Sequence, residues 1–271
     1  MNRGPDFVHL CQPGRQSCGA CCGIYNYADS TRESLVRRFR RRTELYHRMA
    51  GPDFDPEAFS RLVLEGEDPA KRYEVIYCCE FVGFLNDEET RVGCLLHPMQ
   101  NGGRDLRDAS FYGRELCDGH FCPSYTYLAP AEQRALVDLL DDWYLYGLCV
   151  TDIDFAKEYF RLISERVGRM PPPEAFRTGS TRERAIAFFE LKLTWPFRSP
   201  DVNRLGKYYF DGSQYMISFI DYDVLGCERS PFDRIFLSLS SELKSLDDLR
   251  RAEAILESHI AAFARAFGSE T

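Results

Sequence analysis

The sequence predicts a predominantly helical α+β protein with a metal-stapled, cysteine-rich N-terminal part and a helical C-terminal part. Helix-capping signals recur along the chain, two segments alternate as β-hairpins do, and nine of the eleven cysteines precede residue 125. A chain of 271 residues with 44% hydrophobic residues can bury a core. We expect two domains, a cysteine-rich metal-binding domain over 1–128 and a mainly helical domain over 129–271.

Two helices are expected early in the chain. Ser30 and Glu33 have the spacing of a capping box, which predicts a helix over 31–49. Asp55, followed by a proline, gives an N-cap and a first-turn proline for a shorter helix over 56–65.

The first of these helices carries a basic run. Its arginines fall three and four residues apart, so that they form stacked rows: Arg37, Arg38, Arg40, Arg41 and Arg42. Charge runs on helices usually face water, so we expect a solvated face. A site for an anion or an acidic partner is the alternative.

The segment over 75–97 predicts a small β-hairpin with cysteines on both arms, because two apolar stretches flank a polar one at 86–90. Residues 101–125 are rich in Gly, Asp and Arg and have weak periodicity. We expect an irregular segment there, held by metal rather than by its own hydrogen bonds.

The second half is expected to be mainly helical, because apolar residues recur at helical spacing. The predicted elements are helices over 130–147, over 152–167 after a Thr151 cap, from Ser180 to before Pro196, from Ser230-Pro231 onward and over 246–267, with a hairpin over 207–222 around an Asp211-Gly212 turn.

Charge and composition exclude several classes of function. The formal net charge is −8, and neither half has the basic footprint of a nucleic-acid-binding protein. The sequence contains no apolar run of the length that a membrane-spanning helix needs, and its N-terminus lacks the apolar run of a signal peptide. The common nucleotide-binding and hydrolase motifs are also absent from the sequence. We therefore expect a cytoplasmic protein with a small molecule or another protein as its partner, without nucleic acid or membrane. The sequence predicts no oligomeric state.

Eleven cysteines in a reducing compartment point to metal binding or redox chemistry rather than to disulfides. Thiolates bind zinc tetrahedrally and hold iron–sulfur clusters, and the interval from Cys18 to Cys21 lets two sulfurs reach one centre. The expected cofactor is zinc or iron, with an iron–sulfur cluster included. The candidate ligands are Cys11, Cys18, Cys21, Cys22, Cys79, Cys94, Cys117 and Cys122.

The spacing leaves several assignments open. Adjacent Cys21 and Cys22 can serve two centres, or one of them is spare, because neighbouring side chains in extended backbone point to opposite sides. Eight thiolates permit two tetrahedral zinc sites, or a cluster and a second ion. A redox dithiol is a further alternative for Cys18 and Cys21. Either Cys78 or Cys79 can be the ligand at that position. The imidazoles of His97 and His120 can each complete a mixed site. Cys149 and Cys227 are expected to be buried core residues.

These cysteines carry a family resemblance. The run Cys18-Gly19-Ala20-Cys21-Cys22, with Cys79, Val92-Gly93-Cys94 and Cys117 downstream, resembles the cysteine-cluster family typified by YkgJ, which is described as a zinc- or iron-chelating domain. The resemblance covers roughly residues 11–125 and implies metal ligation by the cysteines that match. Family members often have the later cysteine soon after an Arg-Pro pair, whereas here 18 residues separate Pro98 from Cys117.

Two classes of function follow. A related branch of the family is similar to flagellin lysine methylases, which implies an enzymatic role. The first hypothesis is therefore a redox or transferase enzyme whose iron or iron–sulfur centre acts on a substrate held by the helical half. The alternative is a non-catalytic module whose zinc sites are structural and whose helical surface binds another protein. The sequence does not decide whether the chain is an enzyme.

Overall fold

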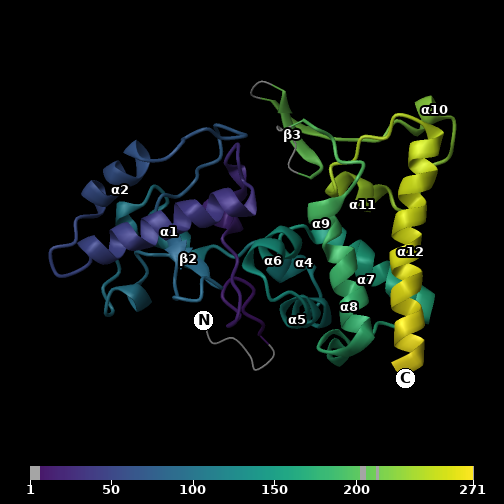
Figure 1. Ribbon diagram of the computed structural model, residues 1–271, viewed down its shortest axis with the longest axis horizontal. Coiled ribbons are helices and arrows are strands. Elements are labelled where there is room, and N and C mark those ends of the chain that lie inside the picture. The colour runs from purple at the N-terminus through teal and green to yellow at the C-terminus, as the bar shows by residue number, and fades with distance from the viewer. Residues whose placement is uncertain (1–6, 202–205, 212–213, 271) are drawn as a thin grey trace. The chain divides into compact units, whose positions relative to one another are not determined.

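The computed structural model describes residues 7–201, 206–211 and 214–270 (Figure 1). Two compact units make up the chain. The cysteine unit consists of His9–Cys122 and Asp142–Gly147. The helical unit consists of Pro123–Asp141 and the residues from Leu148 onward, together with the described residues before His9.

The fold is predominantly helical and carries two small antiparallel hairpins, as expected for the α+β class. In the cysteine unit the elements are the 3₁₀ turns η1 (Ala20–Cys22), η2 (Ile24–Asn26), η3 (Pro98–Gln100) and η4 (Arg107–Ala109), the helices α1 (Arg32–Met49), α2 (Pro56–Glu65) and α3 (Gly113–Gly119), and the strands β1 (Val82–Phe84) and β2 (Val92–Cys94). Helix α6 (Trp143–Val150) begins in this unit.

The helical unit contains the remaining elements. They are α4 (Ser124–Tyr127), α5 (Pro130–Leu139), α7 (Ile153–Val167), η5 (Pro173–Phe176), α8 (Gly179–Phe189), α9 (Leu191–Thr194), β3 (Tyr208–Asp211), β4 (Gln214–Ile217), α10 (Tyr222–Leu225), α11 (Asp233–Ser238) and α12 (Leu246–Glu270). Among the described residues, no helix combines the length and the apolar character needed to cross a membrane.

The core of the cysteine unit forms where α1 packs on the β1–β2 hairpin. Phe39 of α1 is fully buried and lies edge-on to Phe84, with ring centroids 5.8 Å apart, and 5.6 Å from Trp143. Phe59 of α2 stacks on Phe81, which precedes β1. Burying these large rings supplies much of the unit's apolar stabilisation, at roughly 25 cal/mol per Å² of surface removed from water.

Both early helices form as predicted, although the first has a different cap. Thr31, not Ser30, is the N-cap of α1, and its hydroxyl accepts a hydrogen bond from the Ser34 amide at 3.3 Å. In α2 the Asp55 carboxylate accepts from the amides of Glu57 and Ala58, as expected of an aspartate cap.

The predicted β-hairpin over 75–97 is confirmed, but its strands are short. Val82 pairs with Cys94 across the hairpin, so one cysteine lies on the second strand. Cys79 lies just before the first strand rather than on it. The expectation of an irregular 101–125 segment is wrong in part, because α3 carries Cys117 on seven helical residues.

In the helical unit, α12 runs alongside α7 and α8 (Figure 1). The predicted helix over 130–147 is two helices, because Leu140 is extended and Asp142 caps a new helix by accepting from the Leu145 amide. Asp152 caps α7 in place of Thr151, and α8 starts at Gly179, which puts the predicted cap Ser180 inside the helix. The predicted hairpin forms as β3 and β4, and Gly212 of its predicted turn lies outside the described residues.

The Tyr159 hydroxyl generates a stability prediction. It is fully buried among the rings of Phe188, Phe189 and Phe263 and has no hydrogen-bond partner in the described part of the chain. Tyr159→Phe should therefore leave the free energy of unfolding unchanged or raise it by up to about 1 kcal/mol, because the desolvated hydroxyl is removed. Denaturant unfolding measures this. Phe188→Ala is the control and should cost about 3 to 5 kcal/mol.

Candidate metal centre

The CxxCC run folds into the tight turn η1, which is held against a distant segment of the cysteine unit. Gly23, which follows it, has φ +78°, and a Cβ there would lie 2.0 Å from the Tyr77 carbonyl oxygen. The Cys79 amide donates to the Cys22 carbonyl at 2.9 Å, and the Cys18 amide donates to the Cys11 carbonyl at 2.9 Å. Cysteines far apart in sequence are thus connected through the backbone.

The candidate ligands form two sets, and the thiols within each set interact electrostatically with one another. The first thiol group comprises Cys11, Cys18, Cys21 and Cys122: the Cys18 thiol interacts with the other three, and the Cys21 thiol interacts with Cys122 and Cys11. Cys122 is buried, whereas Cys21 is exposed as a residue although the protein atoms around its sulfur desolvate the thiol.

The second thiol group comprises Cys22, Cys79, Cys94 and Cys117. The Cys22 thiol interacts with the other three as well as with Cys21, and the Cys94 thiol interacts with Cys117. All eight candidate ligands therefore fall into two groups of four. Adjacent Cys21 and Cys22 belong to different groups.

Burial and mutual repulsion oppose the ionisation of five of the eight thiols. Burial raises the pKa of Cys21 and of Cys79 to about 12 and that of Cys94 to about 11, and neighbouring thiols add to each shift. Burial also raises the pKa of Cys18 and Cys22 well above its usual value. Several thiolates can coexist in such surroundings only when a cation compensates their charge.

Backbone amides nevertheless point at several of the sulfurs. The amide of Ala20 donates to Cys18, that of Phe81 to Cys79, and those of Leu96 and His97 to Cys94, and each bond lowers the pKa of the thiol that accepts it, although burial outweighs it. The donor is in each case two or three residues after the cysteine. Hydrogen bonds of this kind stabilise thiolates that hold zinc or iron–sulfur clusters.

The thiols of each group are near one another without forming a finished ligand shell. No three His, Cys, Asp or Glu side chains of the described residues are arranged to hold one metal ion. Zinc–sulfur bonds are about 2.3 Å long, so binding by either group requires side-chain rotation toward a common centre. The chemistry of both donor sets, four thiols each, fits zinc and iron–sulfur clusters alike.

Cys78 and Cys79 have different surroundings. The Cys78 thiol is buried and donates to the Gly23 carbonyl at 3.2 Å, and the Asn26 amide lies 3.6 Å from its sulfur. Cys79, in contrast, interacts with Cys94. Cys78 therefore stabilises the turn through its bond to the Gly23 carbonyl, whereas Cys79 belongs to the second thiol group.

The remaining candidate residues have the following surroundings. His97 caps η3 through Nδ1, which accepts from the Met99 amide, and burial lowers its pKa. His120 is exposed after α3, Cys149 is fully buried in α6, and Cys227 is half-buried after α10.

Aromatic side chains lie next to the second thiol group. Tyr77, Phe111 and Tyr112 form a cluster with ring centroids 4.9 to 5.5 Å apart. Burial raises the pKa of Tyr112, and the thiols of Cys22 and Cys79 add to the shift. Tyr112 thus lies close to those two thiols, and Tyr77 interacts with Cys79, while Phe111 is 77% exposed.

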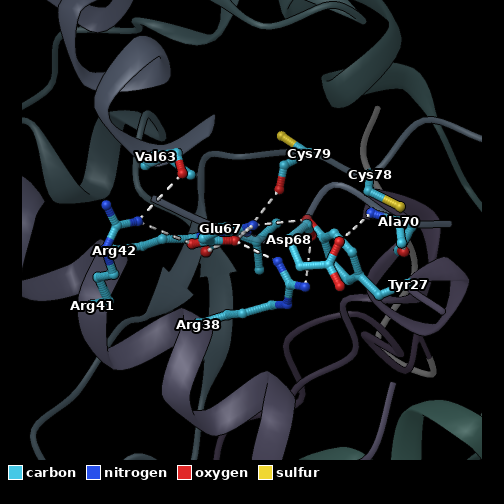
Figure 2. Close-up of polar contacts among 12 residues, drawn as sticks. Tyr27, Arg38, Arg41, Arg42, Val63, Glu67, Asp68, Ala70, Cys78 and Cys79 are labelled. Carbon is cyan, nitrogen blue, oxygen red and sulfur yellow. Dashed lines mark hydrogen bonds and ion pairs between the residues drawn. The ribbon is translucent and has the colours of Figure 1, made fainter. Parts of the chain in front are cut away.

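The expectation of a solvated face on α1 is wrong for two of the five arginines in the basic run. Arg38 and Arg42 are buried, and both pair with the Glu67 carboxylate, at 2.8 and 2.6 Å (Figure 2). Arg41 also approaches Glu67, at 3.6 Å. Arg38 and Arg42 thus face an acidic group within the same unit, whereas Arg37 and Arg40 are exposed to water as expected. In the sequence, the four-residue spacing of Arg38 and Arg42 places both on one row of the helix, which was the only indication of a shared partner. Nothing in the sequence identified Glu67 as that partner.

No family model, curated protein or solved structure matches this chain.

Gly23 provides a test of the turn. Gly23→Ala should lower the free energy of unfolding of the cysteine unit by more than about 2 kcal/mol, because it combines a strained left-handed backbone with a clash against the Tyr77 carbonyl. Denaturant unfolding followed by the fluorescence of Trp143, in a Trp195→Phe background, measures this unit. Gly119→Ala meets no atom within 4 Å and should be neutral or mildly stabilising. Equal stability of the two variants would contradict the turn geometry.

Proposed function

We propose that the cysteine unit is a metal-binding domain with two four-thiolate centres, one formed by the first thiol group and one by the second. The observation that carries the proposal is the division of eight thiols into two electrostatically interacting sets of four. Four cysteines are the ligand set of structural zinc sites and of iron–sulfur clusters. The resemblance of the CxxCC run to the YkgJ-like family supports the same proposal.

The metal would contribute to folding as well as occupy a site. Between Cys11 and Asn26 the regular structure consists of two 3₁₀ turns. Strand β1, which follows Cys79, and strand β2, which ends at Cys94, are each three residues long. Such short elements gain little from their own hydrogen bonds. Ligands drawn from positions 11 to 122 would close long loops, so metal binding would stabilise the folded unit directly.

A complete set of four thiolates leaves no coordination position open on zinc, which favours a structural role for both centres. Iron–sulfur clusters with the same ligands would instead carry electrons. Metal and sulfide analysis distinguishes the two. Protein purified without oxygen and without added metal should contain either zinc and be colourless, or iron with equimolar sulfide and a brown colour.

Single substitutions test the two ligand sets. Cys21→Ser and Cys79→Ser should each remove one centre's metal while the other centre stays loaded, because the two residues belong to different groups. Cys78→Ser and Cys227→Ser are the matched controls and should keep the full metal content. Metal per protein, determined by mass spectrometry under native conditions, gives the answer. Wild-type protein that lacks zinc and iron, with all thiols titratable in the folded state, would refute the proposal.

The pH dependence of metal binding has a predicted sign. Because the pKa values of Cys21, Cys79 and Cys94 are raised to about 11 or 12, these thiols are protonated at pH 7 in the metal-free chain. Each metal ion must displace those protons when it binds. The apparent affinity for the metal should therefore rise with pH, by as much as about 10⁴-fold per pH unit when four thiols lose their protons. Zinc titration in weak buffer with a pH indicator measures the protons released. Binding without proton release would rule out thiol ligation.

A further inference from the structure

Arg42 lies in α1, far from the cysteines in sequence, yet contacts the backbone that carries them. Its side chain is 2% exposed, and all five of its N–H groups are used. Nε and Nη2 donate to the two Glu67 carboxylate oxygens at 2.8 and 2.6 Å, and Nη2 also donates to the Tyr27 hydroxyl at 2.7 Å. The remaining donor, Nη1, faces the cysteine backbone.

Nη1 bridges two carbonyls of the segment that leads into the hairpin. It donates to the Cys79 carbonyl at 3.0 Å and to the Val82 carbonyl at 3.3 Å. Figure 2 shows Glu67 and Cys79 within one polar network with the arginines of α1. Glu67 also forms an ion pair with Arg38, which fixes the carboxylate that holds the Arg42 guanidinium.

These two carbonyls connect Arg42 to three members of the second thiol group. Cys79 is contacted directly, and its amide donates to the Cys22 carbonyl. Val82 is the register partner of Cys94. A shift of the Arg42 guanidinium would therefore displace Cys79 directly, Cys22 through Cys79, and Cys94 through Val82.

The five donors of Arg42 are all used by Glu67, Tyr27 and the carbonyls of Cys79 and Val82. None of these hydrogen bonds goes to a member of the first thiol group.

We infer that Arg42, held by Glu67, is a positioning residue for the metal centre of the second thiol group and not for that of the first. The inference rests on the proposed function. Its basis is the bridge from a buried, fully hydrogen-bonded guanidinium to the Cys79 and Val82 carbonyls. Partners in the outer shell of a metal site typically contribute 10- to 100-fold to affinity.

The test measures each centre alone. Cys21→Ser removes the first centre and Cys79→Ser removes the second, and zinc affinity and the visible absorption of the cobalt-substituted protein are measured in each background. Arg42→Lys keeps the charge but replaces the five-donor fork with a single ammonium. It should weaken the second centre at least about tenfold and change its cobalt spectrum, and it should leave the first centre's affinity within about twofold.

Arg41→Lys is the matched control. Arg41 lies beside Arg42 on the same helix, donates to the Leu62 and Val63 carbonyls at the end of α2 and approaches Glu67. It should leave both centres unchanged. Glu67→Gln keeps the carbonyl contacts of Arg42 available and should weaken the second centre less than Arg42→Lys does.

The outcomes separate the inference from the proposed function. Equal weakening of both centres by Arg42→Lys, or an unchanged second centre, would overturn the positioning role while leaving metal binding intact. If Arg42→Lys does not fold, Glu67→Gln decides: it must affect the second centre more than the first, and equal effects overturn the inference. Absence of metal from both centres of the wild-type protein would instead refute the proposed function.

Discussion

The close approach of the η1 turn to the backbone at Tyr77–Cys79 is the constraint on which the cysteine unit depends. Gly23 leaves no room for a side chain at that contact, and the Cys79 amide bonds to the Cys22 carbonyl across it. A sharp turn also separates the side chains of Cys21 and Cys22, so that each interacts with a different set of thiols. One short turn can therefore supply ligands to two centres.

Electrostatics explains why such a unit would need metal. Thiols that are buried and crowded resist ionisation, and the backbone amides directed at Cys18, Cys79 and Cys94 offset only part of that cost. A bound cation would reverse the balance, because it attracts the thiolates that otherwise repel one another. The buried pair of Arg42 and Glu67 adds a fixed support on the side of the second group. On this account, ligand geometry and local charge are arranged by the same residues.

Much of the fold was predictable because its signals are local. Asp55 with the proline after it, and the apolar spacing along 246–267, identified α2 and α12. Caps were less predictable, since Ser30 and Thr31 are both competent and only the backbone decides between them. The break between α5 and α6 escaped prediction because Asp142 begins a new helix inside a continuous apolar pattern. Likewise, the spacing could list eight cysteines but not divide them, because the division depends on interactions across up to 104 positions, from Cys18 to Cys122.

The central claim concerns the atoms around the metal. X-ray absorption spectroscopy at the zinc and iron edges, on protein isolated without oxygen or added metal, determines them directly. The metal should be bound by sulfur alone, with four sulfur neighbours at about 2.3 Å for each zinc, or with the sulfur shell of iron–sulfur clusters. Nitrogen or oxygen ligands in the first coordination shell, or protein without either metal, would contradict the central claim.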